Sequence, residues 1–355
     1  MPKHKFFTFC YGVILVLASI WLASQVSFIF TPIKVAFQTL LMPFLLAGVL
    51  FYVLKPIIDF MVEHRINRVL AILLMYIALA GALVGLSVAV GPVIQHQMNR
   101  LIETAPRIAE LLWRQWLYFQ ANQASFPDFV NDWIEQATVY IQQLMSAIGQ
   151  NLTNIIGGIT SFILTLVIVP FILFYMLKDG HRFPEGIIRL LPESKRGEAQ
   201  TILSGMNKAL STYVLGQVIV SSCVGIMVYI GYLVIGLEYS LILALVAMFT
   251  NVIPFVGPFI GTFPAMIVGL IESPLMMLKV IIVVVIAQQI ESNFISPQVM
   301  GRVLDVHPLT IILLLLVAGS LAGIIGLILA VPIYAVSKVI VKHMYRLYQL
   351  RLSNK

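Results

Sequence analysis

The sequence predicts an all-α membrane protein that crosses the bilayer several times. Of its 355 residues, 60% are hydrophobic and only 10% are charged, and the mean hydropathy is +0.98. Soluble domains carry about 25% charged residues, so this composition excludes the soluble globular class. Long uncharged runs are the third observation, because a helix needs roughly 20 apolar residues to cross a bilayer core about 30 Å thick.

The uncharged runs predict seven to eight hydrophobic segments. They cover residues 6–30, 35–54, 69–95, 151–177, 209–237, 239–271, 280–290 and 306–337. The first run is too long for the apolar part of a cleaved signal peptide, and a second run follows at once. We therefore expect three transmembrane helices within residues 1–95 and a fourth span at 151–177.

Residues 96–150, between spans three and four, have a different pattern. Apolar residues recur there at helical spacing, first from Met98 to Phe119 and then from Trp133 to Ile148. This spacing indicates two amphipathic helices. They would lie on the membrane surface or pack against other subunits, or the segment is only a connector.

The distribution of lysine and arginine predicts the orientation. Lysine and arginine residues are concentrated at the N-terminus, in the loop after the second span, in residues 178–208 and in the tail, 341–355. Cytoplasmic loops carry an excess of these residues, so both termini are expected in the cytoplasm of a bacterial cell, with 96–150 outside the plasma membrane. Residues 178–208 are then a cytoplasmic helical loop, and 209–340 are the transport core. The basic tail is expected to contact anionic lipid.

The run 239–271 is too long and too rich in helix breakers to be one straight helix. As a single rod it would measure about 50 Å. It contains three prolines and two glycines close together, namely Pro254, Pro258, Pro264, Gly257 and Gly261. Proline removes a backbone donor, and irregular backbone at membrane depth is tolerated only where protein or water surrounds it. We expect a re-entrant hairpin or a steeply broken helix, cut between Asn251 and Gly261.

The run 306–337 has a similar plan. It contains Gly319, Gly323, Gly326 and Pro332. An acidic residue precedes each broken run, and a proline follows it at a similar distance. This pattern indicates a duplicated unit, and two hairpins that enter from opposite faces would make it an inverted repeat of the kind found in transporters.

A polar cluster lies between the two broken runs. It consists of Gln288, Gln289, Glu291 and Asn293. An ionisable side chain within a membrane is a functional candidate, because its burial is costly. The alternative is that Glu291 lies at the headgroup level, as we expect for Glu272.

Enzyme and cofactor chemistry find no support in the sequence. It contains no metalloprotease, serine hydrolase or nucleotide-binding motif, and Cys10 and Cys223 stand apart in apolar runs. We therefore expect no catalytic residue, no metal and no cofactor. The net charge of +7 is explained by basic residues beside spans and does not indicate nucleic acid.

Five motifs in order resemble the autoinducer-2 exporter family of bacterial permeases. They are Pro170–Gly180, Asn251–Pro258, Glu291–Gly301, His307–Leu309 and Gly323–Pro332. The resemblance covers nearly the whole chain and implies seven or eight hydrophobic segments and a homo-oligomer, a pentamer. It implies export of autoinducer-2 for some members and sodium–proton antiport for others, so it leaves the solute open.

We hypothesise a secondary transporter that exports a small polar metabolite or signal. The expected substrate-binding residues are Asn251, Pro254, Gly257, Pro258, Gln288, Gln289, Glu291 and Asn293. The expected hinge and packing residues are Gly261, Gly319, Gly323, Gly326 and Pro332. A coupling cation or proton is a possible partner. The alternatives are a sodium–proton antiporter centred on Glu291 and an oligomeric scaffold without transport.

Overall fold

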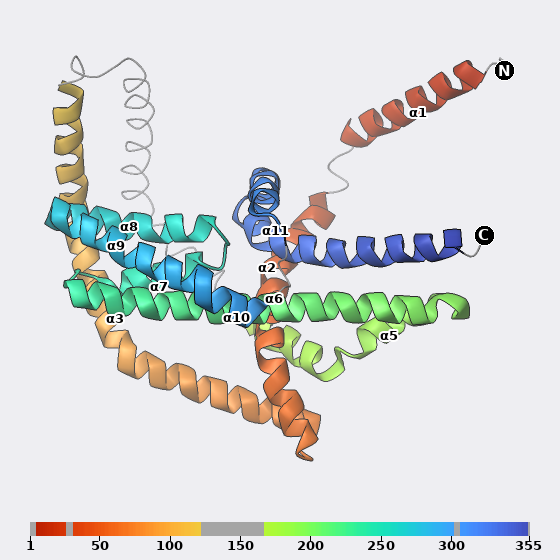
Figure 1. Cartoon of the computed structure of the whole chain (residues 1–355), viewed down its shortest axis with the longest axis horizontal. Helices are drawn as coiled ribbons and strands as arrows, with labels where there is room; N and C mark the ends of the chain where they lie inside the picture. The colour runs from red at the N-terminus through yellow and green to blue at the C-terminus, as the bar shows by residue number, and fades with distance from the viewer. Residues whose placement is uncertain (1–4, 26–30, 122–166, 302–305, 354–355) are drawn as a thin grey trace.

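The computed structural model describes residues 5–25, 31–121, 167–301 and 306–353, and within them every regular element is a helix. This confirms the predicted all-α fold. Figure 1 shows the arrangement. The helices are α1 (Lys5–Gln25), α2 (Thr31–Glu63), α3 (Arg68–Ala121), α5 (Arg182–Arg189), α6 (Glu193–Ile235), α7 (Ser240–Thr250), α8 (Val256–Glu272), α9 (Pro274–Ile290), the π-helix η3 (Glu291–Ile295), α10 (Ser296–Met300) and α11 (Pro308–Ser353). A further helix covers 167–179.

Five helical stretches of the described chain are long and apolar enough to cross a membrane. They are Thr39–Glu63, Arg68–Leu101, Glu193–Ile235, Pro274–Met300 and Pro308–Arg346. Together with the shorter apolar helices α7 and α8, they confirm a multi-pass membrane protein. Most of the expected fourth span, 151–177, lies outside the described residues.

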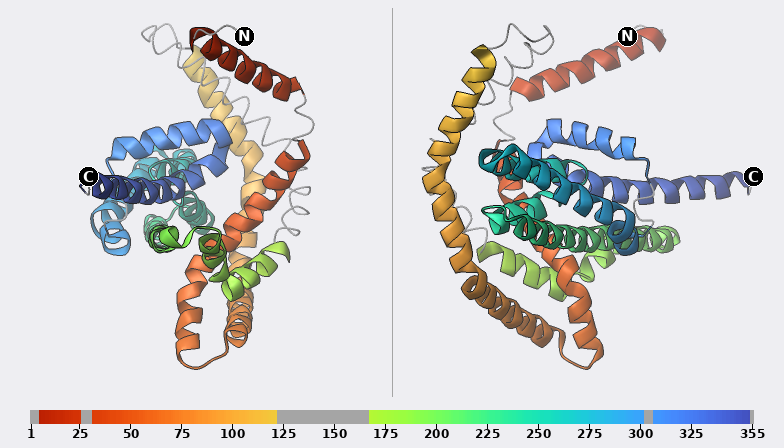
Figure 2. Two further views of the ribbon diagram at one scale, coloured as in Figure 1. Left: turned by 90° about the vertical axis from the view of Figure 1, so that its right-hand side faces the viewer. Right: turned by 60° about the vertical axis from the view of Figure 1, so that its left-hand side comes forward.

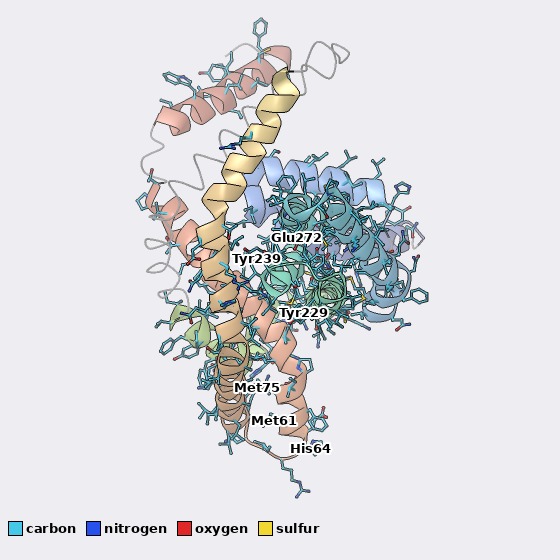
Figure 3. The ribbon with its side chains drawn as sticks, turned by 90° about the vertical axis from the view of Figure 1, so that its left-hand side faces the viewer. Met61, His64, Met75, Tyr229, Tyr239 and Glu272 are labelled. Carbon is cyan, nitrogen blue, oxygen red and sulfur yellow. The ribbon has the colours of Figure 1, made fainter. Side chains whose placement is uncertain are left out.

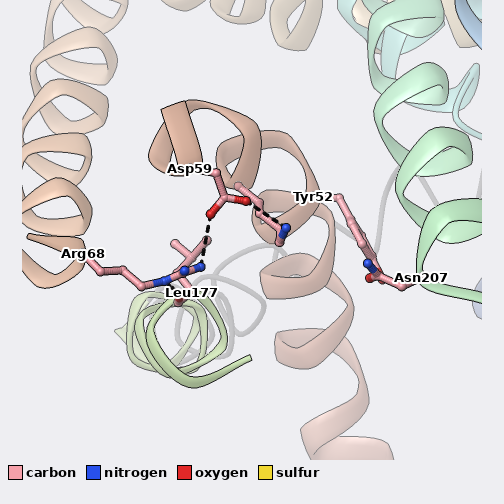
Figure 4. Close-up of polar contacts among 6 residues, drawn as sticks. Tyr52, Asp59, Arg68, Leu177 and Asn207 are labelled. Atoms are coloured by element: carbon pink, nitrogen blue, oxygen red, sulfur yellow. Dashed lines mark hydrogen bonds and ion pairs between the residues drawn. The ribbon is translucent and has the colours of Figure 1, made fainter. Parts of the chain in front are cut away.

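An N-terminal bundle forms where the 167–179 helix packs on α2 and the start of α3. Its buried core includes Phe51, Ile58, Ile72 and Leu173. At its end Asp59 accepts from Lys55 Nζ at 2.8 Å and from Arg68 Nη2 at 3.3 Å, and Arg68 Nε donates to Leu177 O at 2.7 Å (Figure 4). The Arg68 guanidinium, at the start of α3, therefore joins Asp59 of α2 to the 167–179 helix.

Helix α3 is longer than the sequence pattern predicts. It continues without a break from the apolar third span into the first amphipathic segment, across residues 95 and 96. Figure 2 shows it as one curved helix along the side of the molecule. A helix persists across a change from apolar to amphipathic pattern because both patterns share the same period. The second expected amphipathic helix, Trp133–Ile148, lies outside the described residues.

The largest buried core lies where α6 packs against α7, α8 and α9. Helix α6 also runs continuously from the expected cytoplasmic loop into its apolar half, across residues 208 and 209. Two glycines on α6 allow close packing: a Cβ at Gly225 would lie 2.6 Å from Met248 Cβ, and one at Gly231 would lie 2.3 Å from Val283 Cγ1. Small residues at helix contacts are typical of membrane proteins.

The first broken run forms a hairpin, hairpin 1, made of α7, the turn 251–255 and α8. Its arms have 11 and 17 residues, both fewer than the roughly 20 residues of a typical span. They cross closely at glycine: a Cβ at Gly257 would lie 1.9 Å from Thr250 O, and one at Gly261 would lie 2.7 Å from Ala247 Cα. The break is shorter than expected, because Gly257, Pro258 and Gly261 already lie within α8.

The second broken run forms hairpin 2, the two arms of α11 on either side of Ala322 and Gly323. Gly323 has φ +57, a left-handed conformation that favours glycine. A Cβ at Gly326 would lie 1.9 Å from Ala318 O, although eight residues of helix would separate these positions by about 12 Å. The chain therefore reverses sharply here (Figure 2).

Each second arm contains a proline that does not interrupt its helix. Pro264 lies inside α8 and Pro332 inside α11. In each hairpin, the proline lies nine residues after the turn residue that has a positive φ. That residue is Phe255 in hairpin 1 and Gly323 in hairpin 2. This common spacing supports a duplicated hairpin.

Helix α3 also touches the core near the start of hairpin 1. Gln97 Oε1 accepts from the backbone N–H of Ile242 at 3.3 Å, and the Thr104 and Tyr239 hydroxyls lie 3.3 Å apart. Figure 3 labels Tyr239, beside α3. The Gln97 side chain therefore satisfies a backbone donor in the first turn of α7, which has no partner inside that helix.

Candidate functional site

A cavity of about 1000 Å³ lies between hairpin 1 and the α9–η3–α10 helix. Helix α6 and the start of α11 complete its wall. It is lined by Gln217, Asn251, Pro254, Phe255, Pro258, Phe259, Thr262, Phe263, Met266, Ile281, Val284, Val285, Gln288, Gln289, Glu291, Ser292, Ser296, Met300, Val306, Pro308 and Ile311. Most of these side chains are apolar, and a few amides, hydroxyls and one carboxylate accompany them.

The turn of hairpin 1 is held against α6 by a buried hydrogen bond. Gln217 Nε2 donates to the Asn251 backbone carbonyl at 2.7 Å, and both residues are buried. This bond satisfies a carbonyl at the end of α7, where the helix supplies no partner. The Asn251 side-chain amide lines the cavity and has no hydrogen-bond partner within the described part of the chain. It is therefore available to a solute.

The backbone of this turn is strained. Phe255 has φ 62 and ψ −43, a conformation that a residue with a side chain rarely adopts. Such conformations persist where the surrounding structure enforces them, and they occur often at ligand sites. Here the tight crossing of the hairpin arms and the Gln217 hydrogen bond hold the turn in place.

Six of the eight predicted substrate-binding residues line this one cavity. They are Asn251, Pro254, Pro258, Gln288, Gln289 and Glu291. The cavity wall does not include Gly257, which is buried at the crossing of the hairpin arms. Asn293 is also absent from the wall, and its Nδ2 donates to Gln289 O at 2.9 Å and Gln289 Oε1 at 3.0 Å. Asn293 thus orients Gln289 from behind.

Glu291 begins a π-helix that interrupts the long helix from Pro274 to Met300. The Ser296 backbone N–H donates to the Glu291 carbonyl, a bond across five residues. Single turns of π-helix are frequent at functional sites, because the extra residue redirects the side chains. Glu291 lies within the stretch Pro274–Met300, which is long and apolar enough to cross a membrane.

The hinge and packing residues lie apart from the cavity wall. Gly261 is at the crossing of the hairpin 1 arms, and Gly326 is at the crossing of the hairpin 2 arms. Gly319 packs against Leu327, with 3.1 Å from an added Cβ to Leu327 Cδ2, and Gly323 forms the turn. Pro332 lies within the second arm of α11.

Two parts of the cavity wall were not predicted from the sequence. The first is Gln217, an amide in the middle of an otherwise apolar run, and this isolated polarity was the available signal. The second is the series Phe255, Phe259 and Phe263. Phe255 is the last residue of the turn, and Phe259 and Phe263 lie four residues apart on one face of α8. A stripe of apolar residues is usually core, so the spacing alone did not distinguish a cavity wall.

In the described part of the chain, no group of three His, Cys, Asp or Glu side chains is arranged to hold a metal ion. Among the described residues that line the cavity, one has an ionisable side chain, namely Glu291. The arrangement can therefore bind a solute by hydrogen bonds, apolar contact and one negative charge.

Comparison with known proteins gives matches along nearly the whole chain. Residues 13–346 match the family model described as "AI-2E family transporter". "Putative transport protein YueF" of Bacillus subtilis is 43% identical over 361 residues, covering 99% of this chain and 96% of that protein. "Putative transport protein YrrI" of the same organism is 32% identical over 335 residues, covering 94% and 95%. "Putative permease PerM" of Escherichia coli is 28% identical over 313 residues, covering 86% and 87%.

Proposed function

Because the chain belongs to the AI-2E family of transporters, we propose that it is a secondary transporter that exports a small polar metabolite or signal, of the autoinducer-2 type. The solute would bind in the cavity between hairpin 1 and the α9–η3–α10 helix. The residues act by binding and orientation, and none is assigned a catalytic role.

The observation that carries this proposal is the position of Asn251. Its side chain lines the cavity at the tip of a hairpin whose arms are each shorter than a typical span. Transporters place solutes at such breaks, because half-helix ends and unwound backbone supply polarity at membrane depth. Gln288 and Gln289 on the facing helix add amide donors and acceptors to the same cavity.

Exchange of autoinducer-2 in proteoliposomes that contain the purified full chain tests this function. Wild-type protein should exchange the solute, and Asn251→Leu should reduce exchange at least about tenfold, because a leucine offers no hydrogen bond to a polar solute. Ser320→Leu is the matched control, since Ser320 lies near the tip of hairpin 2 and outside the cavity wall. Absence of exchange by well-folded wild-type protein would sink this solute.

A sodium–proton antiporter is the second candidate, and the position of Glu291 favours it. Glu291 lines the cavity and belongs to a helical stretch of 27 residues that is long and apolar enough to cross a membrane. A carboxylate there can exchange a proton for a cation. A sodium pulse applied to proteoliposomes with an internal pH dye tests this function. Glu291→Gln should then abolish sodium-dependent proton movement.

The remaining proposals concern location and assembly. We propose a bacterial plasma membrane because of the family, with both termini in the cytoplasm because of the lysine and arginine counts. We propose a homo-oligomer from the family resemblance alone. The apolar side chains exposed along α3, such as Ile77, Val84 and Val88, lie in a candidate span that lipid covers. Cross-linking in native membranes tests the oligomer.

A further inference from the structure

The cavity is much larger than a small polar metabolite requires. Its volume of about 1000 Å³ stands at the upper end of the range of about 300–1,000 Å³ for sites that hold drug-sized molecules. Polar groups, among them Asn251, Gln288 and Glu291, form only part of the cavity wall. The remaining wall is apolar and can contact a larger, apolar ligand.

One wall of the cavity is an aromatic surface. Phe255 at the end of the hairpin 1 turn and Phe259 and Phe263 on α8 all line the cavity, with exposed fractions of 47%, 79% and 54%. Aliphatic residues of α9, Ile281, Val284 and Val285, line the same cavity. The face of an aromatic ring carries partial negative charge, so it attracts cations and disfavours anions. The same ring surface also favours contact with apolar groups.

The charge of the described wall has one sign. Glu291 is its ionisable residue, and no lysine, arginine or histidine lines the cavity in the part of the chain that the structure describes. A carboxylate beside aromatic faces is complementary to an organic cation, whose charge is met by Glu291 and whose body covers the phenyl rings.

We propose that this cavity binds amphipathic organic cations of drug size, with the cationic centre beside Glu291 and the apolar groups against Phe255, Phe259 and Phe263. The inference rests on the proposed function in one respect, namely that the same cavity is the solute site. A bound cation of this class would cover the polar groups and compete with a small polar solute.

Tetraphenylphosphonium and tetraphenylborate form a matched pair of probes, since they share shape and size and differ in the sign of the charge. Binding of each to the full chain in lipid nanodiscs is measured by equilibrium dialysis, with empty nanodiscs subtracted. We expect saturable binding of tetraphenylphosphonium to the wild type. Glu291→Gln should weaken it at least about tenfold and Phe259→Ala about fivefold.

Two control variants separate the site from general effects. Glu272→Gln removes an exposed carboxylate at the end of α8, and Phe249→Ala removes an exposed ring from α7; neither residue lines the cavity. Both variants should bind tetraphenylphosphonium as the wild type does. Tetraphenylborate should show no binding that depends on Glu291.

The inference is overturned if tetraphenylphosphonium does not bind saturably, or if Glu291→Gln and Phe259→Ala bind it as well as their controls do. Preference for tetraphenylborate would also overturn it. Loss of autoinducer-2 exchange by a protein that still binds tetraphenylphosphonium would refute the proposed solute alone. Exchange that is insensitive to tetraphenylphosphonium, together with no cation binding, would refute this inference alone.

Discussion

The two hairpins share a construction but differ at their tips. In both, the arms cross at a glycine that admits no Cβ, and a proline follows the turn by nine residues. In the tip of hairpin 1, Asn251 and Ile253 are buried, at 5% and 6% exposed, and Phe255 is 47% exposed, whereas the tip of hairpin 2 is open, with Leu321 81% and Ile324 69% exposed. A broken helix alone therefore does not make a site.

The difference arises from what each tip contacts. The tip of hairpin 1 packs between α6 and α11, where Ile253 joins Tyr213 and Ile311 in a buried cluster and Gln217 donates to its backbone. Near the tip of hairpin 2, the Ser320 hydroxyl donates to Val317 O of its own helix. Of the two tips, the first has a polar residue, Asn251, that lines a cavity and is fixed by a hydrogen bond from another helix. We therefore propose that the solute site lies at this tip.

The largest expected effect tests what the hairpins share. Gly257→Val and Gly326→Val each place a side chain where a Cβ would already lie 1.9 Å from a backbone carbonyl oxygen. Each should cost about 3 kcal/mol or more, because a backbone must move. The fraction of monodisperse protein and its thermal midpoint in detergent measure this cost. A Gly326→Val variant as stable as wild type would break the structural equivalence of the two hairpins.

The second prediction concerns the burial of the two tips. Ile253→Ala should destabilise by about 2–4 kcal/mol, since it leaves a cavity in a buried cluster. Leu321→Ala should change stability by less than about 0.5 kcal/mol, because that side chain is exposed. Thermal midpoints of the two variants, measured side by side, check this contrast. Equal losses would contradict the difference in burial.

A smaller loss of stability is expected when the hydrogen bond between Gln217 and the tip of hairpin 1 is removed. Gln217→Leu removes the donor to the buried Asn251 carbonyl and should cost about 1–3 kcal/mol, with reduced exchange of solute. Ser222→Ala is the control on the same helix, because its hydroxyl donates only to Val218 O of that helix. If Gln217→Leu and Ser222→Ala have the same thermal midpoint and exchange rate, the bond does not position the turn.

The presence of both breaks could be predicted from the sequence, but their limits could not. Clustered prolines and glycines in Asn251–Gly261 indicated irregular backbone, yet only 251–255 leave the helix. Proline is tolerated in the first turn of a helix, where its missing N–H has no partner to lose. Pro258 therefore continues α8, and composition alone does not reveal where such a helix begins.

The site could be predicted in part, for a related reason. Asn251 and Glu291 stood out because they are polar in apolar surroundings. The partner of Asn251 was missed, because contact between α6 and the hairpin turn joins residues 34 positions apart. The π-helix was missed as well, since its hydrogen bonds depend on packing and not on a residue pattern.

The most direct test of the account compares solute protection at the two hairpins. In a chain whose Cys10 and Cys223 are replaced by alanine, Thr262→Cys in hairpin 1 and Ser320→Cys in hairpin 2 are labelled by a water-soluble methanethiosulfonate reagent, with and without saturating autoinducer-2. Thr262 lines the cavity but is not among the residues expected to bind the solute. We predict that the solute slows labelling at position 262 at least about fivefold, since it occupies the cavity that Thr262 lines, and leaves position 320 unchanged. Protection at 320 with none at 262 would contradict the assignment of the solute site to hairpin 1.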